Sequence, residues 1–352
     1  MPAKTKKKPT GDTPESLRAD VEKRYPGAVM LGSDPSLEIQ RLSTGVLSVD
    51  WGLGGGFCRN RHSELYGPPS TGKTTLCYYA MAETQRQGGR VAFLDIERKF
   101  DAVYAAQCGV NVDDLEFEQQ SLDGNRSIDI LEAWVRSGLY DMTVLDSIAA
   151  LLPKEDREQS MEDGGGFNTH QAKMMSKAMR KLTAANKQTA CLYINQVRED
   201  IGSTFFKKDV TSGGRAMGHY AALRLALVKI DTLKKKKGII SHTGATESKE
   251  VAYGHRVLMR IVKEQTGGAY EGDTTTFVID YELGCIDPIE DLIYLGLQYG
   301  LVQGSDSRWQ VVGYEDEKSS TRNTFKSWLR KNRAVAQELE EMIINYDQDG
   351  DE

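Results

Sequence analysis

The chain has 352 residues, of which 39% are hydrophobic and 27% charged. This composition is typical of a globular protein with a sizeable core, and it excludes a fully disordered or collagen-like chain. No apolar run reaches the roughly 18 residues of a membrane span, and the basic N-terminus lacks the apolar stretch of a secretory signal. We expect a cytoplasmic protein of about two domains, with no membrane partner.

The net charge of -6, from 45 basic and 51 acidic residues, is unevenly distributed. Residues 338–352 contain seven acids and no Lys or Arg, and without these acids residues 1–337 carry a net charge of +1. The first ten residues contain four Lys and no acid. The acidic total therefore does not exclude a nucleic-acid partner.

Cysteine and histidine give no sign of a disulfide framework or a metal module. The five Cys and five His are scattered, without a CxxC or HExxH pattern. We expect no metal site built from these residues.

The first part of the chain alternates between predicted helices and strands. Residues 16–25 mix charged and apolar side chains at helical spacing and end before Pro26, which predicts a short leading helix. Continuous apolar runs alternating with helical stretches predict a parallel sheet covered on both faces. These runs are 62–66, 90–97, 140–147 and 190–195.

The second part predicts a different arrangement. Strand-like runs at 222–230, 256–264 and 275–281 alternate in polarity and lie close together, which predicts an antiparallel extension of the sheet. From Asp287 onward the pattern is mostly helical. Two long stretches, 155–168 and 198–214, resemble neither helix nor strand, and loops of this length are usually functional or disordered.

GPPSTGKT at 67–74 matches the phosphate-loop pattern G-x-x-x-x-G-K-[ST] in full. It follows a predicted strand and precedes a predicted helix, and this context disfavours a chance Gly-rich turn. Backbone N–H groups of such a loop surround phosphate oxygens, Lys73 reaches the β- and γ-phosphates, and Thr74 offers its hydroxyl to Mg²⁺. The sequence thus predicts ATP and Mg²⁺ as cofactors. The predicted binding residues are Gly67, Pro68, Pro69, Ser70, Thr71, Gly72, Lys73, Thr74 and Thr75.

Three further polar residues end predicted strands. Asp146 is a candidate Mg²⁺ ligand, and Glu97 is a candidate for polarising the attacking water. Gln196 could sense the γ-phosphate. Each residue also has an ordinary structural interpretation. Asp146 could simply end a buried strand, Glu97 could be a surface or helix-capping acid, and Gln196 could be a polar residue at a strand end.

These motifs, in this order, resemble the bacterial RecA recombinase family over nearly the whole chain. The resemblance implies an α/β fold: a P-loop RecA-type ATPase core with a mostly parallel central sheet, an N-terminal helical arm and a small α+β C-terminal domain. It implies an arm and polymerisation segment at 1–40, a core at 41–284 containing DNA-binding loops 155–168 and 198–214, a C-terminal domain at 285–337 and an acidic tail at 338–352. The matching segments are LSTGVLSVDWGLGGG (42–56), GPPSTGKTT (67–75), AFLDIERKFDAVYAAQCGV (92–110), VLDSIAALLPK (144–154), MMSKAMRKL (174–182) and YINQVR (193–198).

The resemblance also implies roles at the nucleotide. Glu97 becomes the catalytic carboxylate, Gln196 the switch between nucleotide and DNA, and Lys263 a contact to the ATP of a neighbouring protomer. The remaining implied nucleotide contacts are Asp101, Tyr104 and Tyr281 at the adenine, and Asp146 with Ser147 at the strand that holds the metal.

For single-stranded DNA, the resemblance implies contacts from the helix after the first loop and from the second loop. Ile201 would wedge between bases, while Phe205, Phe206, Lys207 and Lys208 supply apolar and cationic contacts. A basic run at 234–237, with Lys229 and Arg260, predicts either a weaker site for duplex DNA or a solvated turn. The backbone contacts implied are Lys173, Ser176, Arg180, Arg198, Gly213 and Gly214.

The chain departs from the family at three places. The family usually carries a Lys two residues after the Arg that corresponds to Arg198, whereas here Glu199 and Asp200 follow Arg198. Gln265 stands where the family has a second Lys near Lys263. His219 stands where the family often has an aromatic residue that inserts into the adjacent protomer. These departures indicate a divergent member, bacterial or phage-encoded.

The resulting expectation is an ATP-dependent DNA recombinase of the bacterial cytoplasm, or of a bacterial host. It would form head-to-tail helical filaments on single-stranded DNA, hydrolyse ATP to ADP and phosphate, exchange strands with homologous duplex DNA and act in DNA repair and the SOS response. Two alternatives stay open: a ring-forming hexameric motor or helicase of the same core fold, and a non-catalytic regulator that uses ATP as an assembly switch.

Overall fold

The computed structural model describes residues 13–27, 29–119, 123–158, 167–198, 210–240 and 246–349. The chain divides into two compact units, 1–40 and 41–352. In the first, α1 (Pro14–Arg24) begins at Thr13, whose side chain accepts a hydrogen bond from the Ser16 N–H in a capping box. This confirms the predicted leading helix. A short 3₁₀ turn, η1 (Pro35–Leu37), follows.

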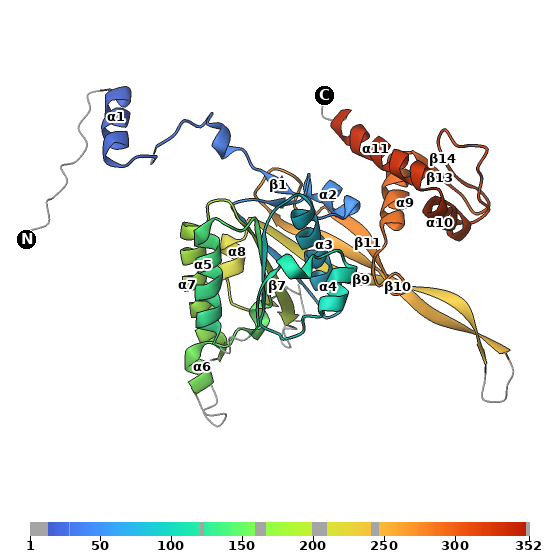
Figure 1. Cartoon of the computed structure of the whole chain (residues 1–352), viewed down its shortest axis with the longest axis horizontal. Coiled ribbons are helices and arrows are strands. Elements are labelled where there is room, and N and C mark those ends of the chain that lie inside the picture. Colours follow the sequence, from blue (N-terminus) through green and yellow to red (C-terminus); the bar gives the residue numbers. More distant parts are fainter. Residues whose placement is uncertain are drawn as a thin grey trace, which may run out of the picture. The chain divides into compact units, whose positions relative to one another are not determined.

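The second unit is built on a large sheet with the order β12-β11-β10-β9-β3-β7-β6-β4-β5, and β8 pairs with β7 (Figure 1). Neighbours from β9 to β5 run parallel, whereas β9 to β12 pair antiparallel. Both halves of the sheet were predicted. The strands are β3 (Arg61–Gly67), β4 (Val91–Asp95), β5 (Glu116–Glu118), β6 (Met142–Asp146), β7 (Ala190–Arg198), β8 (Val210–Thr211), β9 (Leu223–Ile240), β10 (Thr246–Glu264), β11 (Thr274–Asp280) and β12 (Cys285–Ile286).

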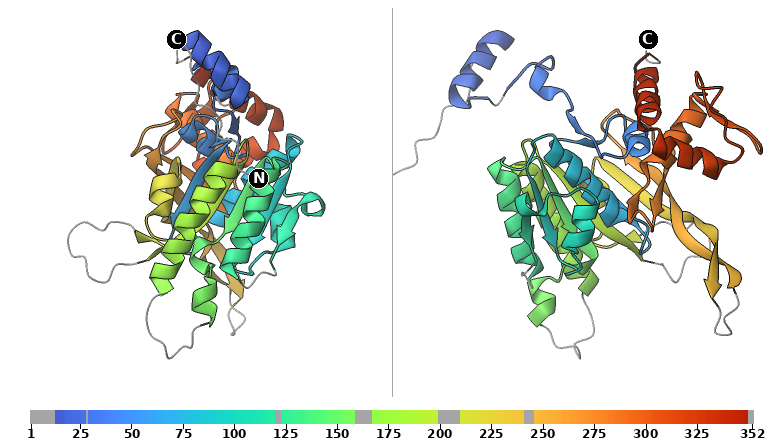
Figure 2. Two further views of the ribbon diagram at one scale, coloured as in Figure 1. Left: turned by 90° about the vertical axis from the view of Figure 1, so that its left-hand side faces the viewer. Right: turned by 45° about the vertical axis from the view of Figure 1, so that its right-hand side comes forward.

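Helices cover both faces of the parallel half (Figure 2). Consecutive strand residues point to opposite faces. Val144 packs in one core with α3 (Lys73–Arg86), and Leu145 packs in the other with α5 (Gly124–Ser137) and α7 (Phe167–Ala185). Two-sided burial explains why these strands are continuously apolar. The other helices of this unit's first part are α2 (Leu47–Leu53), α4 (Ala102–Gln107), α5 (Gly124–Ser137), α6 (Lys154–Glu158), α7 (Phe167–Ala185) and α8 (Ala216–Tyr220).

Regular structure enters both of the long stretches predicted to be irregular. Helix α6 takes residues 154–158 and α7 begins at Phe167, so both ends of the first stretch are helical. Strand β7 continues to Arg198, and β8 pairs with it at Val210–Thr211. Residues 212–214 form a turn, and residues 159–166 and 199–209 of the two stretches lie outside the described part.

Strands β9 and β10 are much longer than the predicted runs 222–230 and 256–264. They pair along a ribbon that projects from the sheet (Figure 1). The basic run Lys234–Lys237 lies within β9 and is therefore not a turn; Lys237 faces Lys249 in the register. A run of lysines is compatible with an exposed strand, because backbone hydrogen bonds to the neighbouring strand hold it in place while the charged side chains stay in solvent.

The C-terminal part has a third apolar core, formed around α9 (Pro288–Gln298), α10 (Arg322–Lys331) and α11 (Arg333–Asp349). A hairpin of β13 (Val302–Gly304) and β14 (Trp309–Val311) interrupts the predicted helical region. Residues 338–349 of the predicted acidic tail form the second half of α11, where Leu339 and Ile343 are buried.

A buried acid joins this C-terminal part to the core. Asp291 of α9 is 2% exposed; its Oδ2 accepts from Ser48 N of α2 at 3.4 Å, and its Oδ1 has no partner in the described part of the chain. Burial, with Asp287 and Glu290 adding repulsion, raises the pKa of Asp291 to about 8. The ionised form therefore destabilises the fold.

Because the folded-state pKa of Asp291 is raised, its contribution to stability is complete below about pH 4 and declines as the pH rises to about 8. Asp291→Asn should remove this decline. We expect the excess of its free energy of unfolding over that of the parent to be roughly 4 kcal/mol larger at pH 8.5 than at pH 4.5, in urea titrations. The exposed Asp113→Asn is the control, and equal gains at both pH values would contradict the assignment.

Candidate nucleotide site and DNA interface

The phosphate loop joins β3 to α3 and requires glycine at two positions. Gly67 has φ +154°, and a Cβ there would meet the Leu227 carbonyl oxygen of β9 at 2.1 Å. Gly72 has φ +81° at the N-cap of α3, and a Cβ there would lie 2.5 Å from Ile279 Cδ1 of β11. The loop is thus held closely against neighbouring strands, with the helix N-terminus open for an anion.

Lys73 is only 7% exposed and is folded into the loop. Its Nζ donates to the carbonyl oxygens of Gly67 at 3.0 Å and Pro68 at 2.7 Å. Burial lowers the pKa of Lys73, while the nearby carboxylates Asp146 and Glu97 oppose this effect. The loop therefore holds a cation where an anionic ligand would bind.

Thr74 and Asp146 lie together, as predicted for a metal site. The Thr74 hydroxyl donates to Asp146 Oδ2 at 2.7 Å. Burial raises the pKa of Asp146 to about 6, although the Thr74 bond opposes the rise. Hydroxyl and carboxylate oxygens suit Mg²⁺, which is usually held by one or two protein ligands together with water and phosphate oxygens. No cluster of three or more His, Cys, Asp or Glu side chains that could hold a metal occurs among the described residues.

Glu97 stands at the centre of a cluster formed by the ends of β4, β6 and β7. Its Oε1 accepts from Ser147 Oγ at 2.5 Å and from Gln196 Nε2 at 2.7 Å, and Lys99 Nζ lies 2.6 Å from Oε2. Burial alone would raise the pKa of Glu97, but the bonds from Lys99, Ser147 and Gln196 lower it overall. Three residues predicted from different strands thus converge; Lys99 was not predicted, although it follows Glu97 by two positions.

A cavity of about 340 Å³ adjoins the phosphate loop. It is lined by Thr75, Tyr104 and Tyr281, and the Thr75 hydroxyl lies 2.8 Å from the Tyr104 hydroxyl. Asp101 Oδ1 accepts from the N–H groups of residues 103 and 104, so this carboxylate caps α4 and orients Tyr104. The structure thereby brings together the residues expected at the adenine. His255 also lines the cavity, and no motif in the sequence pointed to it.

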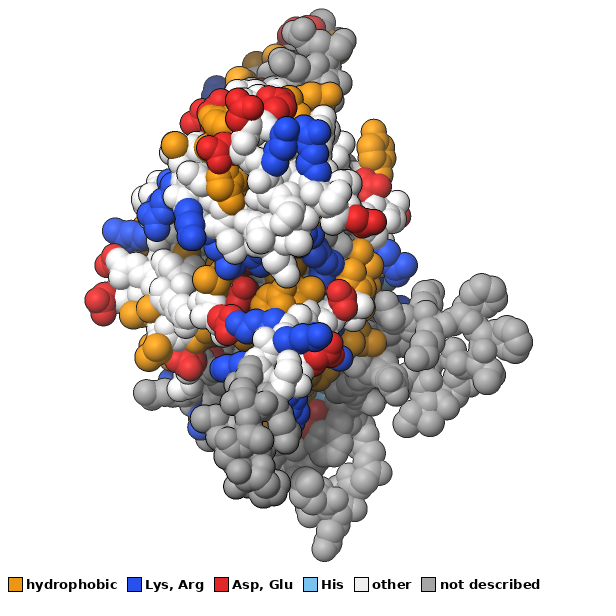
Figure 3. Space-filling model, turned by 90° about the vertical axis from the view of Figure 1, so that its right-hand side faces the viewer, with side chains coloured by type: hydrophobic (Ala, Val, Ile, Leu, Met, Phe, Trp, Pro, Cys, Tyr) orange, Lys and Arg blue, Asp and Glu red, His pale blue; other side chains and the backbone are white. Residues whose placement is uncertain are grey.

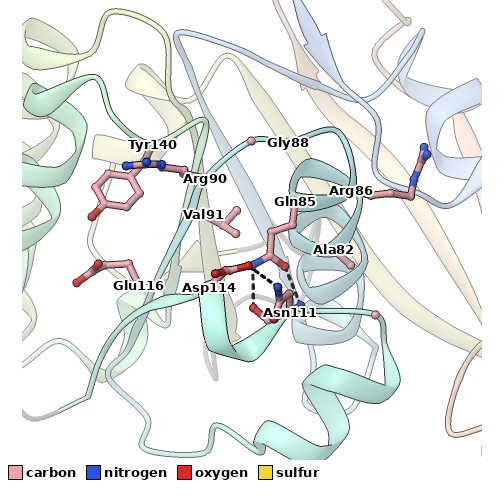
Figure 4. Close-up of a pocket in the computed structure, with 12 residues that line it drawn as sticks. Ala82, Gln85, Arg86, Gly88, Arg90, Val91, Asn111, Asp114, Glu116 and Tyr140 are labelled. Carbon is pink, nitrogen blue, oxygen red and sulfur yellow. Dashed lines mark hydrogen bonds between the residues drawn. The ribbon is translucent and has the colours of Figure 1, made fainter.

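A larger cavity of about 650 Å³ lies at the opposite, amino end of the parallel strands (Figure 4). Its lining includes Arg90 and Tyr140. Also in its wall, the Gln85 side-chain amide donates to the Asn111 carbonyl oxygen and accepts from the Asn111 backbone N–H, and the Asn111 side chain donates to the Asp114 carboxylate. Ligands of open α/β sheets bind at the carboxyl ends of the strands, so this cavity is not the candidate site.

One face of α7 carries the first predicted DNA contacts. Lys173 and Arg180 are exposed and Ser176 is half-buried, and their spacing of three and four places them on one side of the helix. Arg180 Nε donates to the Ser176 carbonyl oxygen at 3.1 Å. Two cations and a hydroxyl therefore form a row suited to a phosphate backbone.

Gly213 and Gly214 pack directly against α7. A Cβ at Gly214 would meet Ala172 Cβ at 2.7 Å, and the Gly213 N–H donates to Gln171 Oε1 at 3.3 Å. The adjacent Arg215 is exposed and was not predicted, although it is a cation beside two glycines. The Arg198 side chain lies outside the described part of the chain. So do the other predicted contacts of the second loop, which are Ile201, Phe205, Phe206, Lys207 and Lys208.

Lys263 of β10 is bonded within its own protomer. Its Nζ donates to the carbonyl oxygens of Gly218 at 3.0 Å and Ala221 at 2.7 Å, around α8. His219, on the same helix, is exposed. Lys263 and His219 thus lie close together, and within the described residues Lys263 makes no hydrogen bond to the phosphate loop of its own chain.

Comparison with known proteins decides the family. Residues 15–275 match the family described as RecA N-terminal domain. The chain is 38% identical to Protein RecA of Herpetosiphon aurantiacus, covering 90% of this chain and 84% of that one. It is 36% identical to Protein RecA of Rickettsia massiliae, covering 95% of both chains, and 36% identical to that of Brevibacillus brevis, covering 94% of this chain and 90% of the other.

The chain belongs to the RecA family. The expected fold class is confirmed, and the RecA-family chain is an ATP-dependent DNA recombinase with DNA-dependent ATPase activity. Membership also supports nucleotide binding, DNA binding and self-association. Within the described ranges, no helix is both long and apolar enough to cross a membrane.

Proposed function

We propose that this RecA-family chain binds ATP with Mg²⁺ at the phosphate loop, assembles head to tail into a helical filament on single-stranded DNA, and pairs that strand with a homologous duplex. The observation that carries the proposal is the bond between Gln196 and Glu97. Gln196 lies in β7, the strand that leads into the second predicted DNA loop, and Glu97 lies beside the phosphate loop. One hydrogen bond therefore connects the two sites.

Each residue of the nucleotide site has a role in this proposal. Lys73 binds the β- and γ-phosphates, and Thr74 with Asp146 holds Mg²⁺, which neutralises phosphate charge when bound. Glu97 orients the attacking water and accepts its proton. Gln196 leaves Glu97 for the γ-phosphate, so that occupancy of the nucleotide site moves the start of the DNA loop.

We assign the primary strand to the face of α7 and the adjoining Gly213–Gly214 turn. Lys173, Arg180 and Arg215 supply cations from described, exposed positions. Phosphate contacts of this kind bind any sequence, which suits a protein that leaves sequence matching to base pairing. We also propose that Lys263 and His219 face a neighbouring protomer and that Lys263 reaches the neighbour's ATP.

The projecting ribbon is proposed as the weaker site for duplex DNA. Two of its lysines lie close to acids: Lys234 Nζ is 3.9 Å from Glu250 Oε2, and Lys235 pairs with Glu282. Figure 3 likewise shows basic and acidic side chains close together on this side of the molecule. Such a mixed surface favours weak, salt-sensitive binding.

The C-terminal acids should compete with DNA for this surface. Neutralising Asp347, Asp349, Asp351 and Glu352 together, as Asn or Gln, keeps the chain length and the buried part of α11. We expect about tenfold tighter binding of duplex DNA at low salt, because four repulsive charges are removed, and a smaller gain at high salt. Fluorescence anisotropy would measure both, and an unchanged affinity at every salt concentration would contradict the idea.

Strand exchange between a circular single strand and a homologous linear duplex tests the proposal. We expect joint molecules that require ATP and homology. Unwinding of a forked duplex without joint molecules would indicate a ring-forming motor, and the absence of DNA-stimulated ATP turnover would indicate a non-catalytic switch. We place this activity in the cytoplasm of a bacterial cell.

A further inference from the structure

A histidine stands beside the cavity that adjoins the phosphate loop. His255 of β10 is 5% exposed and lines this cavity together with Tyr104 and Tyr281. Its register partner across the ladder is Ile279 of β11, two residues before Tyr281. The two paired strands therefore fix where the imidazole stands relative to the cavity wall.

One ring nitrogen of His255 already has a partner. Its Nδ1 lies 2.9 Å from the Tyr281 hydroxyl, and the two ring centroids are 5.5 Å apart. Tyr281 is 48% exposed, and its own backbone N–H donates to the Tyr253 carbonyl at 2.7 Å. The histidine thus restrains the free end of a side chain whose backbone end is fixed by the sheet.

The other ring nitrogen has no partner among the described residues. Nε2 of His255 is buried and makes no hydrogen bond there. Burial, together with the positive charge of Lys229, lowers the pKa of His255, so the ring is neutral near pH 7. A neutral imidazole carries one donor and one acceptor, and a buried polar atom without a bond is costly unless a ligand supplies the missing partner.

We propose that His255 is a nucleoside-binding residue: Nδ1 holds Tyr281 as one wall of the base site, and Nε2 makes a hydrogen bond to the bound nucleoside. The inference rests on the proposed binding of ATP at the phosphate loop. The phosphate contacts stay with Lys73 and the phosphate loop, and Ser70 and Gly72 of that loop line the same cavity. His255 therefore governs affinity for the nucleoside part and leaves the hydrolysis step unchanged.

Three variants separate the two ring nitrogens. His255→Ala loses both contacts, Tyr281→Phe loses only the contact to Nδ1, and His255→Asn keeps a polar atom near Nδ1 but has none at Nε2. In DNA-stimulated ATP hydrolysis we expect KM to rise about tenfold, two- to threefold and fivefold respectively, with kcat within about twofold of the parent. Tyr140→Phe, at the far end of the sheet, is the matched tyrosine control.

Inorganic tripolyphosphate, which has no nucleoside, is the second probe. Its inhibition constant against ATP hydrolysis should be the same for the parent and His255→Ala. In competition binding with a fluorescent ATP analogue, Lys73→Ala should bind tripolyphosphate much more weakly than the parent. An unchanged KM in His255→Ala and His255→Asn, or an equal rise in His255→Ala and Tyr281→Phe, would overturn the Nε2 contact. Normal tripolyphosphate binding by Lys73→Ala would instead overturn the proposed phosphate site itself.

Discussion

Lys73→Ala should lower kcat/KM for DNA-stimulated ATP hydrolysis by at least about 100-fold, since one preorganised cationic donor at a transferring phosphoryl group is typically worth this much. In the structure Lys73 Nζ is bonded to two loop carbonyls and is almost fully buried. No other described lysine is placed in the loop to replace it. Steady-state release of phosphate at saturating single-stranded DNA measures the effect.

The control for this variant is Lys187→Ala, because Lys187 is an exposed lysine before β7, away from the strand ends that form the site. It should hydrolyse ATP at the parental rate. Circular dichroism of both variants confirms that the fold is kept. If Lys73→Ala hydrolysed ATP normally, the phosphate loop would not be the catalytic site.

Glu97→Gln should bind ATP and assemble on DNA like the parent, but hydrolyse ATP about 100-fold or more slowly. A correctly placed general base contributes about 10²–10⁴-fold, and the amide cannot accept the proton. The substitution keeps an oxygen for the Ser147 and Gln196 bonds, so the cluster stays connected. Single-turnover hydrolysis separates this loss from any change in ATP binding.

Glu116→Gln, in the edge strand β5, replaces an exposed acid and serves as the matched control. It should leave single-turnover hydrolysis unchanged. A Glu97→Gln variant that lost ATP affinity but kept its hydrolysis rate would assign Glu97 to binding, against the proposed role.

The nucleotide site could be predicted from sequence largely because its signals are local. Glycines and Lys73 lie within one loop, and Glu97, Asp146 and Gln196 lie at or near the carboxyl ends of apolar strands. Parallel strands present their carboxyl ends at the same edge of the sheet, so residues far apart in the sequence converge there. The structure confirms that convergence by the bonds between Glu97, Ser147 and Gln196.

The register and the length of the paired strands could not be predicted. His255 and Tyr281 are 26 residues apart and meet only because β10 and β11 pair in one register. The lysine run looked like a turn because lysines are common in turns, yet the ladder with β10 makes it a strand. The acidic residues of 338–349 obscured the helical pattern of this segment. Its buried apolar side chains are Leu339 and Ile343, which lie four residues apart on the inner face of α11.

Electron microscopy of the full chain with long single-stranded DNA and a non-hydrolysable ATP analogue tests the central claim most directly. The claim is that ATP at the phosphate loop drives helical assembly on a single strand. We predict continuous helical filaments that cover the DNA, require the nucleotide and are absent for Lys73→Ala. Closed rings, or bare DNA in the presence of the analogue, would contradict it.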